Sequence, residues 1–108
     1  MHFIDLKDTF KKQLAPGVTS SLAWGDKLML SVVELDPGST VPMHSHPHEQ
    51  AGIVLEGEFD LTIGGETRRV QKGDMYIIPG GVEHAAVTGE GKAVTLDIFH
   101  PVREDYKT

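Results

Sequence analysis

The chain of 108 residues contains no cysteine, so no disulfide can form and nothing points to an oxidising compartment. It also lacks any apolar run that approaches the roughly 18 residues of a membrane-spanning helix. The N-terminal residues lack the apolar core and cleavage site of a signal peptide. These absences predict a cytoplasmic protein that does not enter a membrane.

Positive charge is scarce as well. Ten Lys and Arg stand against 16 Asp and Glu, which gives a formal net charge of −6. A protein that binds nucleic acid needs clustered cations to displace phosphate counterions, so this balance predicts no nucleic-acid partner. The length fits one domain spanning residues 1–108. A domain of this size buries only about two-thirds of its unfolded surface, which favours a homodimer.

Helical periodicity is nearly absent, whereas 12 glycines and 6 prolines divide the chain into short strand-like runs. Only residues 6–14 predict a short helix, because Leu6, Phe10 and Leu14 recur four apart. Residues 58–71 predict a hairpin that turns at Gly64-Gly65. Further strands are expected at 18–24, 27–36, 50–57, 74–79, 83–88 and 92–99. This pattern indicates an all-β sandwich or barrel.

A histidine-rich stretch, "VPMHSHPHEQ", occupies residues 41–50. In an extended chain, His44, His46, His48 and Gln50 would share one face. Pro47 can insert a bulge, which leaves the orientation of His48 open. Two imidazoles two residues apart can meet one transition-metal ion, although the same spacing also occurs among polar residues beside a turn.

A third imidazole could come from the segment "IIPGGVEH", where a turn at residues 79–81 delivers His84 to the start of the next strand. Two histidines are too few ligands for a metal site, so His84 at this position would complete the site as a third ligand. His2 and His100 have no comparable setting and are expected at the surface.

One acidic residue, Asp97, lies within the strand predicted at 92–99. Val94, Leu96 and Ile98 form an apolar face, and Asp97 shares the opposite face with Phe99. An acid on the interior face of a closed sheet is costly unless it is paired or functional. The alternative is an edge strand on which Asp97 faces solvent.

Two groups of residues have the spacing of the cupin motifs, and on these residues the chain resembles a small cupin. The first motif, at 38–57, and the second, at 73–88, match the family pattern at eight of ten positions. The matching positions, with two departures, are Gly38, His44, His46, Gln50, Gly57, Gly73, Pro79, Gly81, His84 and Thr88. The resemblance implies a double-stranded β-helix, which is a jelly-roll barrel of two antiparallel sheets, with one divalent transition metal per chain.

The two departures are Gln50, which replaces the usual glutamate, and Thr88, which replaces an asparagine that is not a ligand. A glutamine oxygen can coordinate a metal but brings no negative charge, so the ion keeps its full +2 and is a stronger Lewis acid. Gln50 could instead lie beside a three-histidine site without ligating. The metal could be Ni, Zn, Fe, Mn or Co.

A narrower resemblance lies at residues 96–106, "LDIFHPVREDY". This segment is similar to the ending of cupins that open the ring of 4,5-unsaturated monouronates from pectin and alginate to the linear keto form. Those proteins carry "HDQ" where this chain has "HEQ" at 48–50, although the interval after the second histidine is one residue shorter here. The resemblance implies metal ligands at His44, His46, Gln50 and His84, and substrate contacts from Asp97, Phe99 and Arg103.

In such a site we expect Asp97 to act as a base, because a nearby divalent ion holds a carboxylate ionised. Arg103 could form a bidentate pair with the carboxylate of a small anionic sugar acid or oxyacid, or it could remain solvated. Phe99 would line the pocket or fill the core, and His48 could support a ligand from outside. The alternatives are a metal-dependent dioxygenase or isomerase acting on another small molecule, and a ligand-binding sensor without turnover.

The N-terminal segment "HFIDL", residues 2–6, could form a strand that pairs with a neighbouring subunit. Small cupins often dimerise by such an exchange. The resemblance therefore adds to the expectation of a homodimer.

Overall fold

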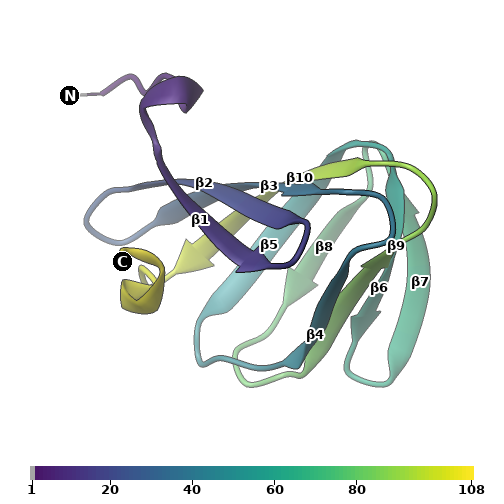
Figure 1. Cartoon of the computed structure of the whole chain (residues 1–108). Coiled ribbons are helices and arrows are strands. Elements are labelled where there is room, and N and C mark those ends of the chain that lie inside the picture. Colours follow the sequence, from purple (N-terminus) through teal and green to yellow (C-terminus); the bar gives the residue numbers. More distant parts are fainter. Residues whose placement is uncertain (1) are drawn as a thin grey trace.

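The computed structural model describes residues 2–108, which form two antiparallel β-sheets packed face to face (Figure 1). The elements are η1 (Leu6–Asp8), β1 (Phe10–Ala15), β2 (Val18–Trp24), β3 (Met29–Leu35), β4 (Thr40–His44), β5 (Glu49–Glu56), β6 (Glu58–Ile63), β7 (Glu66–Gln71), β8 (Met75–Ile78), β9 (His84–Thr88), β10 (Ala93–His100) and η2 (Glu104–Tyr106). One sheet has the order β1-β2-β3-β10-β5-β8, and the other β4-β9-β6-β7. Within residues 2–108, no helix is long and apolar enough to cross a membrane.

The all-β, two-sheet prediction is confirmed, and so is the hairpin at 58–71. Strands β6 and β7 pair from Glu58 opposite Gln71 to Ile63 opposite Glu66, with the turn between them at Gly64-Gly65. Gly64 has a φ of 62°, the left-handed conformation that such a turn requires. Phe59 and Leu61 from this hairpin are buried in the core, as the alternation predicts.

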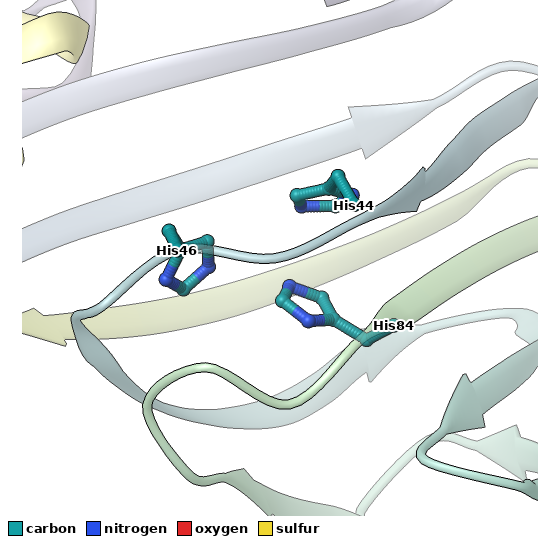
Figure 2. A group of neighbouring side chains, drawn as sticks. All are labelled: His44, His46 and His84. Atoms are coloured by element: carbon teal, nitrogen blue, oxygen red, sulfur yellow. The ribbon is translucent and has the colours of Figure 1, made fainter.

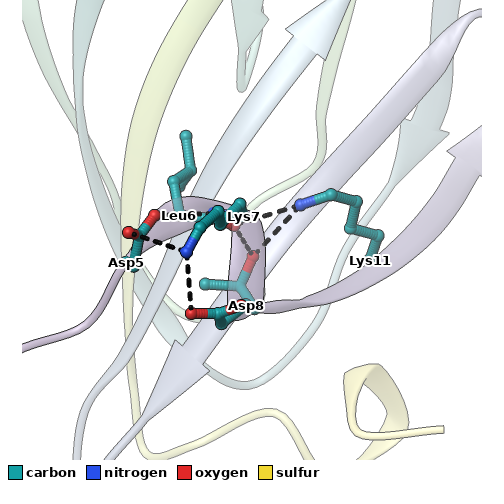
Figure 3. A network of polar contacts seen from close by, with 6 residues as sticks. Asp5, Leu6, Lys7, Asp8 and Lys11 are labelled. Carbon is teal, nitrogen blue, oxygen red and sulfur yellow. Dashed lines mark hydrogen bonds and ion pairs between the residues drawn. The ribbon is translucent and has the colours of Figure 1, made fainter.

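The helix predicted at residues 6–14 is wrong. Only η1 is helical, and Phe10–Ala15 instead form the edge strand β1, which pairs with β2. Residues four apart share one face on a strand as well as on a helix, so the spacing of Phe10 and Leu14 fits both structures. A surface network holds η1 against the start of this strand (Figure 3). In it Lys11 Nζ donates to the Leu6 carbonyl, and Lys7 pairs with Asp5 and Asp8.

The stretch at residues 41–50 is not one continuous strand. Strand β4 ends at His44, a loop carries residues 45–48, and β5 begins at Glu49. The ladder is irregular between Val41 and His44, around Pro42, and not at Pro47 as the sequence suggested. Parity along a single strand therefore does not explain why Gln50 is buried and Glu49 exposed. That division follows from β5 alone, in which Gln50 faces the interior.

The interior between the sheets has two distinct ends. One, which we call the apolar end, consists of Val18, Val33, Leu35, Val54, Phe59, Leu61, Val70, Ala86 and Ala93. The other, the polar end, contains His44, His46, Gln50, His84 and Asp97. Strand β10 runs through both: Ala93, Thr95, Asp97 and Phe99 are buried, and the residues between them are half-buried. The prediction for this strand is thus confirmed, and Asp97 lies on the interior face.

Candidate metal centre

Three imidazoles converge at the polar end, from the end of β4, the following loop and the start of β9 (Figure 2). The ligand-type nitrogens of His44, His46 and His84 all lie within 4.8 Å of one another. The ring centroids of His44 and His84 are 4.2 Å apart, and those of His46 and His84 are 4.9 Å apart. The sequence expectation that His84 joins the His-x-His pair in space therefore holds.

Sheet pairing and one close loop contact bring the three residues together. His44 and His84 are direct cross-strand partners in β4 and β9, which places their side chains side by side. The Gly81 amide donates to the His46 carbonyl at 2.8 Å, so the turn before His84 holds the loop that carries His46. At Gly80 an added Cβ would lie 2.4 Å from the Pro47 carbonyl oxygen, so only glycine permits this approach.

Each imidazole is oriented by a backbone carbonyl at its Nδ1. Nδ1 of His44 faces the Pro42 carbonyl at 2.8 Å, Nδ1 of His46 faces that of His48 at 3.1 Å, and Nδ1 of His84 faces that of Val82 at 2.9 Å. A carbonyl only accepts, so in His44 and His84 Nδ1 is the protonated donor and the neutral ring keeps a lone pair on Nε2. His46 has an acceptor at each ring nitrogen, the His48 carbonyl at Nδ1 and the Gln50 side-chain oxygen at Nε2. This is the arrangement in which histidine ligands are oriented for a metal.

The fourth donor atom is the side-chain oxygen of Gln50, 3.1 Å from Nε2 of His46. The Gln50 side chain also lowers the pKa of Asp97, which is the effect of its amide nitrogen being directed toward that carboxylate. Its oxygen therefore faces the imidazoles. Within residues 2–108, Nε2 of His84 is buried without a hydrogen-bond partner. Three imidazoles and one amide oxygen that converge in this way fit a divalent transition metal, which would replace the proton shared between His46 and Gln50.

The electrostatics of the site favour the neutral form of His46 and His84. Burial, together with the nearby Arg103 and His84, lowers the pKa of His46 from 6.5 to about 4. Burial also lowers the pKa of His84, with smaller contributions from His44 and Arg103. Neutral imidazole is the form that donates to a metal, so the site is prepared for an ion at neutral pH.

Asp97 lies beside the four donors and is only 7% exposed. Strand β10 is flanked by β3 and β5, so the alternative of a solvent-facing acid on an edge strand is wrong. Burial raises the pKa of Asp97 to about 6, against the opposing effect of hydrogen bonds from Tyr76 and Gln50. Asp97 and Gln50 line one cavity together with His44 and His84.

Arg103 lines the same cavity and is only 8% exposed, so the alternative of a solvated C-terminal arginine is wrong. Its Nε and Nη2 donate to the two carboxylate oxygens of Asp105, which leaves Nη1 outside the pair. The guanidinium lies 3.8 Å from the centre of the Tyr106 ring and 5.2 Å from that of Phe99. Phe99 both lines the cavity and packs in the core, so its two expected roles are compatible.

The other residues that the sequence singled out lie outside the group of three imidazoles. The His48 carbonyl accepts from His46, whereas the His48 ring lies outside the group of three imidazoles. Thr88 is buried, and its hydroxyl bonds the Asp36 carbonyl and the Ser39 amide, which ties β9 to the turn before β4. This explains how the chain accommodates a threonine at that motif position. His2 and His100 are exposed, as expected.

Sequence reasoning missed three residues around the site. Asp105 holds the Arg103 side chain, Tyr76 donates to Asp97, and Gly52 lies beneath that contact. A glycine inside the strand "QAGIVLEG" is itself a signal, because interior strand glycines often mark a close approach. Nothing in "DMYIIP" singles out Tyr76.

Comparison with known proteins agrees with this geometry. Residues 31–99 match the family model of the cupin domain. The chain belongs to the cupin family. The pectin degradation protein KdgF of Dickeya dadantii is 33% identical over 107 residues, which cover 97% of this chain and 96% of that protein.

Two solved cupins have closely similar folds. An RmlC-like cupin from Shewanella frigidimarina gives a TM-score of 0.90 at 29% identity and covers 98% of this chain and 96% of that one. KdgF from a Halomonas species gives a TM-score of 0.88 at 30% identity and covers 98% of both chains. The cupin prediction, made on the spacing of the two motifs, is confirmed.

Proposed function

We propose that this chain is a metal-dependent cupin enzyme that opens the ring of a small unsaturated sugar acid, with 4,5-unsaturated uronates as the best substrate class. The observation that carries this proposal is the buried Asp97 carboxylate, placed beside four converging donors in the cavity that Arg103 lines. The similarity to KdgF, which is named for pectin degradation, supports the choice of substrate.

His44, His46, His84 and Gln50 would hold the ion, and Ni, Zn, Fe, Mn and Co all suit such a donor set. When bound, the ion would act as a Lewis acid toward substrate oxygens. Four protein donors leave coordination positions open on a metal that accepts five or six. Because Gln50 adds no charge, the site as a whole stays cationic and favours an anionic ligand.

Asp97 would transfer the proton. It accepts the proton of the hemiacetal hydroxyl as the bond between C1 and the ring oxygen breaks, and C1 becomes an aldehyde. The ring oxygen keeps the bonding electrons as an enolate on C5, and C4 takes up the proton to give the 5-keto form. The reaction is an isomerisation that consumes no oxidant. A carboxylate whose pKa lies near 6 is largely ionised at neutral pH, which suits a base.

Arg103 would bind the substrate carboxylate. The ring of Tyr106 and the Asp105 carboxylate hold its guanidinium in place, and the side chain reaches the cavity wall from the end of β10. A fixed guanidinium binds a planar carboxylate with little loss of side-chain entropy. Phe99 would form the apolar wall beneath the sugar ring.

The test combines metal content with product formation. Protein purified without added metal should hold about one ion per chain and linearise unsaturated galacturonate or guluronate monomers, followed by NMR. Asp97→Asn should retain the metal and lose about 10²- to 10⁴-fold in turnover. Oxygen consumption with other substrates would support a dioxygenase instead, and ligand binding without any product would support a sensor. Protein that takes up no metal even after reconstitution would contradict the proposal.

We also propose a homodimer formed through the outer face of the six-stranded sheet. Met75 and Ile77, on the edge strand β8, are 78% and 64% exposed. The residues that pair with them, and the next ones across this face, are uncharged: Ala51, Ile53, Leu96 and Ile98. Glu49 lies at the edge of the face. On a chain with a formal charge of −6, this is a face where two copies can meet without repulsion. Phe3 and Ile4, exposed in the N-terminal segment, could add to the contact.

Sedimentation of an Ile77→Glu variant tests the dimer. It should sediment as a monomer with its metal content unchanged, whereas the matched variant Val87→Glu, exposed on the other sheet, should remain dimeric. A wild-type chain that is monomeric at high concentration would contradict the pairing.

A further inference from the structure

Three residues form one row across neighbouring strands beside the metal centre. Gly52 of β5 is the register partner of Tyr76 in β8 on one side and of Asp97 in β10 on the other. The Tyr76 side chain reaches across β5, and its hydroxyl donates to Oδ1 of Asp97 at 2.5 Å. An edge strand thus contributes a side chain to the centre of the sheet.

The row depends on the absence of a side chain at position 52. A Cβ placed on Gly52 would lie 2.4 Å from Oδ1 of Asp97 and 2.4 Å from Cζ of Tyr76. These are the two groups that the hydrogen bond joins. Gly52 is not among the glycines with positive φ, so its backbone conformation does not demand glycine. Glycine is required instead by the lack of space beneath the Tyr76–Asp97 contact.

The Tyr76 phenol is a permanent donor in this setting. Burial and the adjacent Asp97 carboxylate raise its pKa far above the ordinary value of 10.0. The Asp97 carboxyl group therefore has one oxygen fixed by the phenol. Rotation of the carboxyl about its Cβ–Cγ bond would break the contact with Tyr76 and leave a buried oxygen unpaired.

We propose that Tyr76 is a positioning residue that fixes the orientation of the Asp97 carboxylate toward the cavity, and that Gly52 provides the space for this contact. The inference rests on the proposed function, in which Asp97 moves the substrate proton. Tyr76 acts through Asp97, because its hydroxyl donates to that carboxylate. The alternative is that Tyr76 only fills the core, since its ring also packs against the apolar end.

Tyr76→Phe separates the two roles, because it keeps the ring and removes only the hydroxyl. We expect kcat to fall about ten- to a hundredfold, which is the loss of one hydrogen bond to a charged group, with KM and metal content nearly unchanged. In the Asp97→Asn background the same change should cost nothing further, because the residue on which Tyr76 acts is already inactive. Full kcat in Tyr76→Phe, or an equal loss in the Asp97→Asn background, would overturn the proposal.

Gly52→Ala tests the proposal independently, and we expect it to lower kcat at least as much as Tyr76→Phe. Its matched control is Gly65→Ala, since a Cβ at Gly65 meets nothing within 4 Å and this variant should keep wild-type kcat. If the wild-type chain turned over none of the sugar acids, the result would contradict the proposed function but not the positioning role of Tyr76. Crystal structures of metal-loaded wild type and Tyr76→Phe would then decide: a rotated Asp97 carboxyl supports the positioning role, and an unchanged one overturns it.

Discussion

The two ends of the barrel interior are built on the same strands but differ in what they contribute. At the apolar end, the Ala93 position of β10 pairs with Leu35, and the surrounding side chains are hydrophobic. Four residues further along the strand, Asp97 pairs with Ser31 and Gly52, which leave room for a carboxylate and its partners. One strand therefore contributes to an apolar core at its start and to a polar site at its end.

This difference separates stability from function within a small fold. Burying apolar surface stabilises the apolar end, whereas the buried imidazoles and carboxylate of the polar end are costly until a ligand pairs with them. Substitutions at the two ends should therefore have opposite signatures. Changes at the polar end should alter metal binding and turnover, and changes at the apolar end should alter the free energy of unfolding.

His84→Ala should have the largest effect and act on the polar end alone. It removes one of four donors, so metal affinity should fall by more than about a hundredfold and turnover should fall with it. The chelator-treated protein should unfold close to the wild-type denaturant midpoint, because loss of the hydrogen bond to the Val82 carbonyl is offset by removal of a buried nitrogen that has no partner. Elemental analysis and urea unfolding measure the two quantities. Wild-type metal content in this variant would contradict the assignment of the ligands.

Val18→Ala should show the reverse pattern. Val18 is fully buried at the apolar end and does not line the cavity, so the variant should lose about 2 kcal/mol of unfolding free energy through lost methyl burial and a small void. Metal content per folded chain and kcat should remain as in the wild type. If metal binding weakened in parallel with stability, the two ends would be one cooperative unit and the contrast between them would fail.

Much of this division could be predicted from sequence, and the failures have physical causes. The spacing of His44, His46 and His84 predicted the cluster, and the alternation in 92–99 placed Asp97 inside. Residues 6–14 were misassigned because a repeat of four is compatible with both a helix and a strand. The contact of Tyr76 with Asp97 spans three strands, and which edge strand lies beside β5 is a property of topology that no local pattern contains.

Gln50→Glu should sharpen the contrast by giving the polar end the residue usual in the family. The added charge should strengthen metal binding, because a carboxylate is a better partner for a divalent ion than an amide. It should also lower turnover by about tenfold, since the amide that favours the ionised form of Asp97 is replaced by a second negative charge. Metal titration and kcat measure the two effects, and a gain in both would contradict the role given to Gln50.

The smallest effect should appear in the pH dependence of stability of the chelator-treated protein. The pKa of His46 is lowered from 6.5 to about 4, so between these values the unfolded chain binds more protons and stability falls as the pH falls. His84 acts in the same direction. Asp97 acts in the opposite one: its pKa is raised from 3.8 to about 6, so the folded chain binds more protons in that range and stability rises as the pH falls.

Asp97→Asn removes the opposing contribution. The variant should be at least as stable as wild type at pH 7.5, where the wild-type chain carries a buried carboxylate, and it should lose stability more steeply between pH 6 and pH 5. Urea unfolding at these pH values measures the difference. Asp60→Asn is the matched control, because the Arg69 guanidinium lowers the pKa of that exposed carboxyl and moves its titration below this window. If the unfolding free energy changed equally with pH in Asp97→Asn and wild type, the Asp97 carboxyl would not take up a proton in the folded chain between pH 6 and pH 5. The buried Asp97 carboxylate would then not lower the stability of the protein at neutral pH.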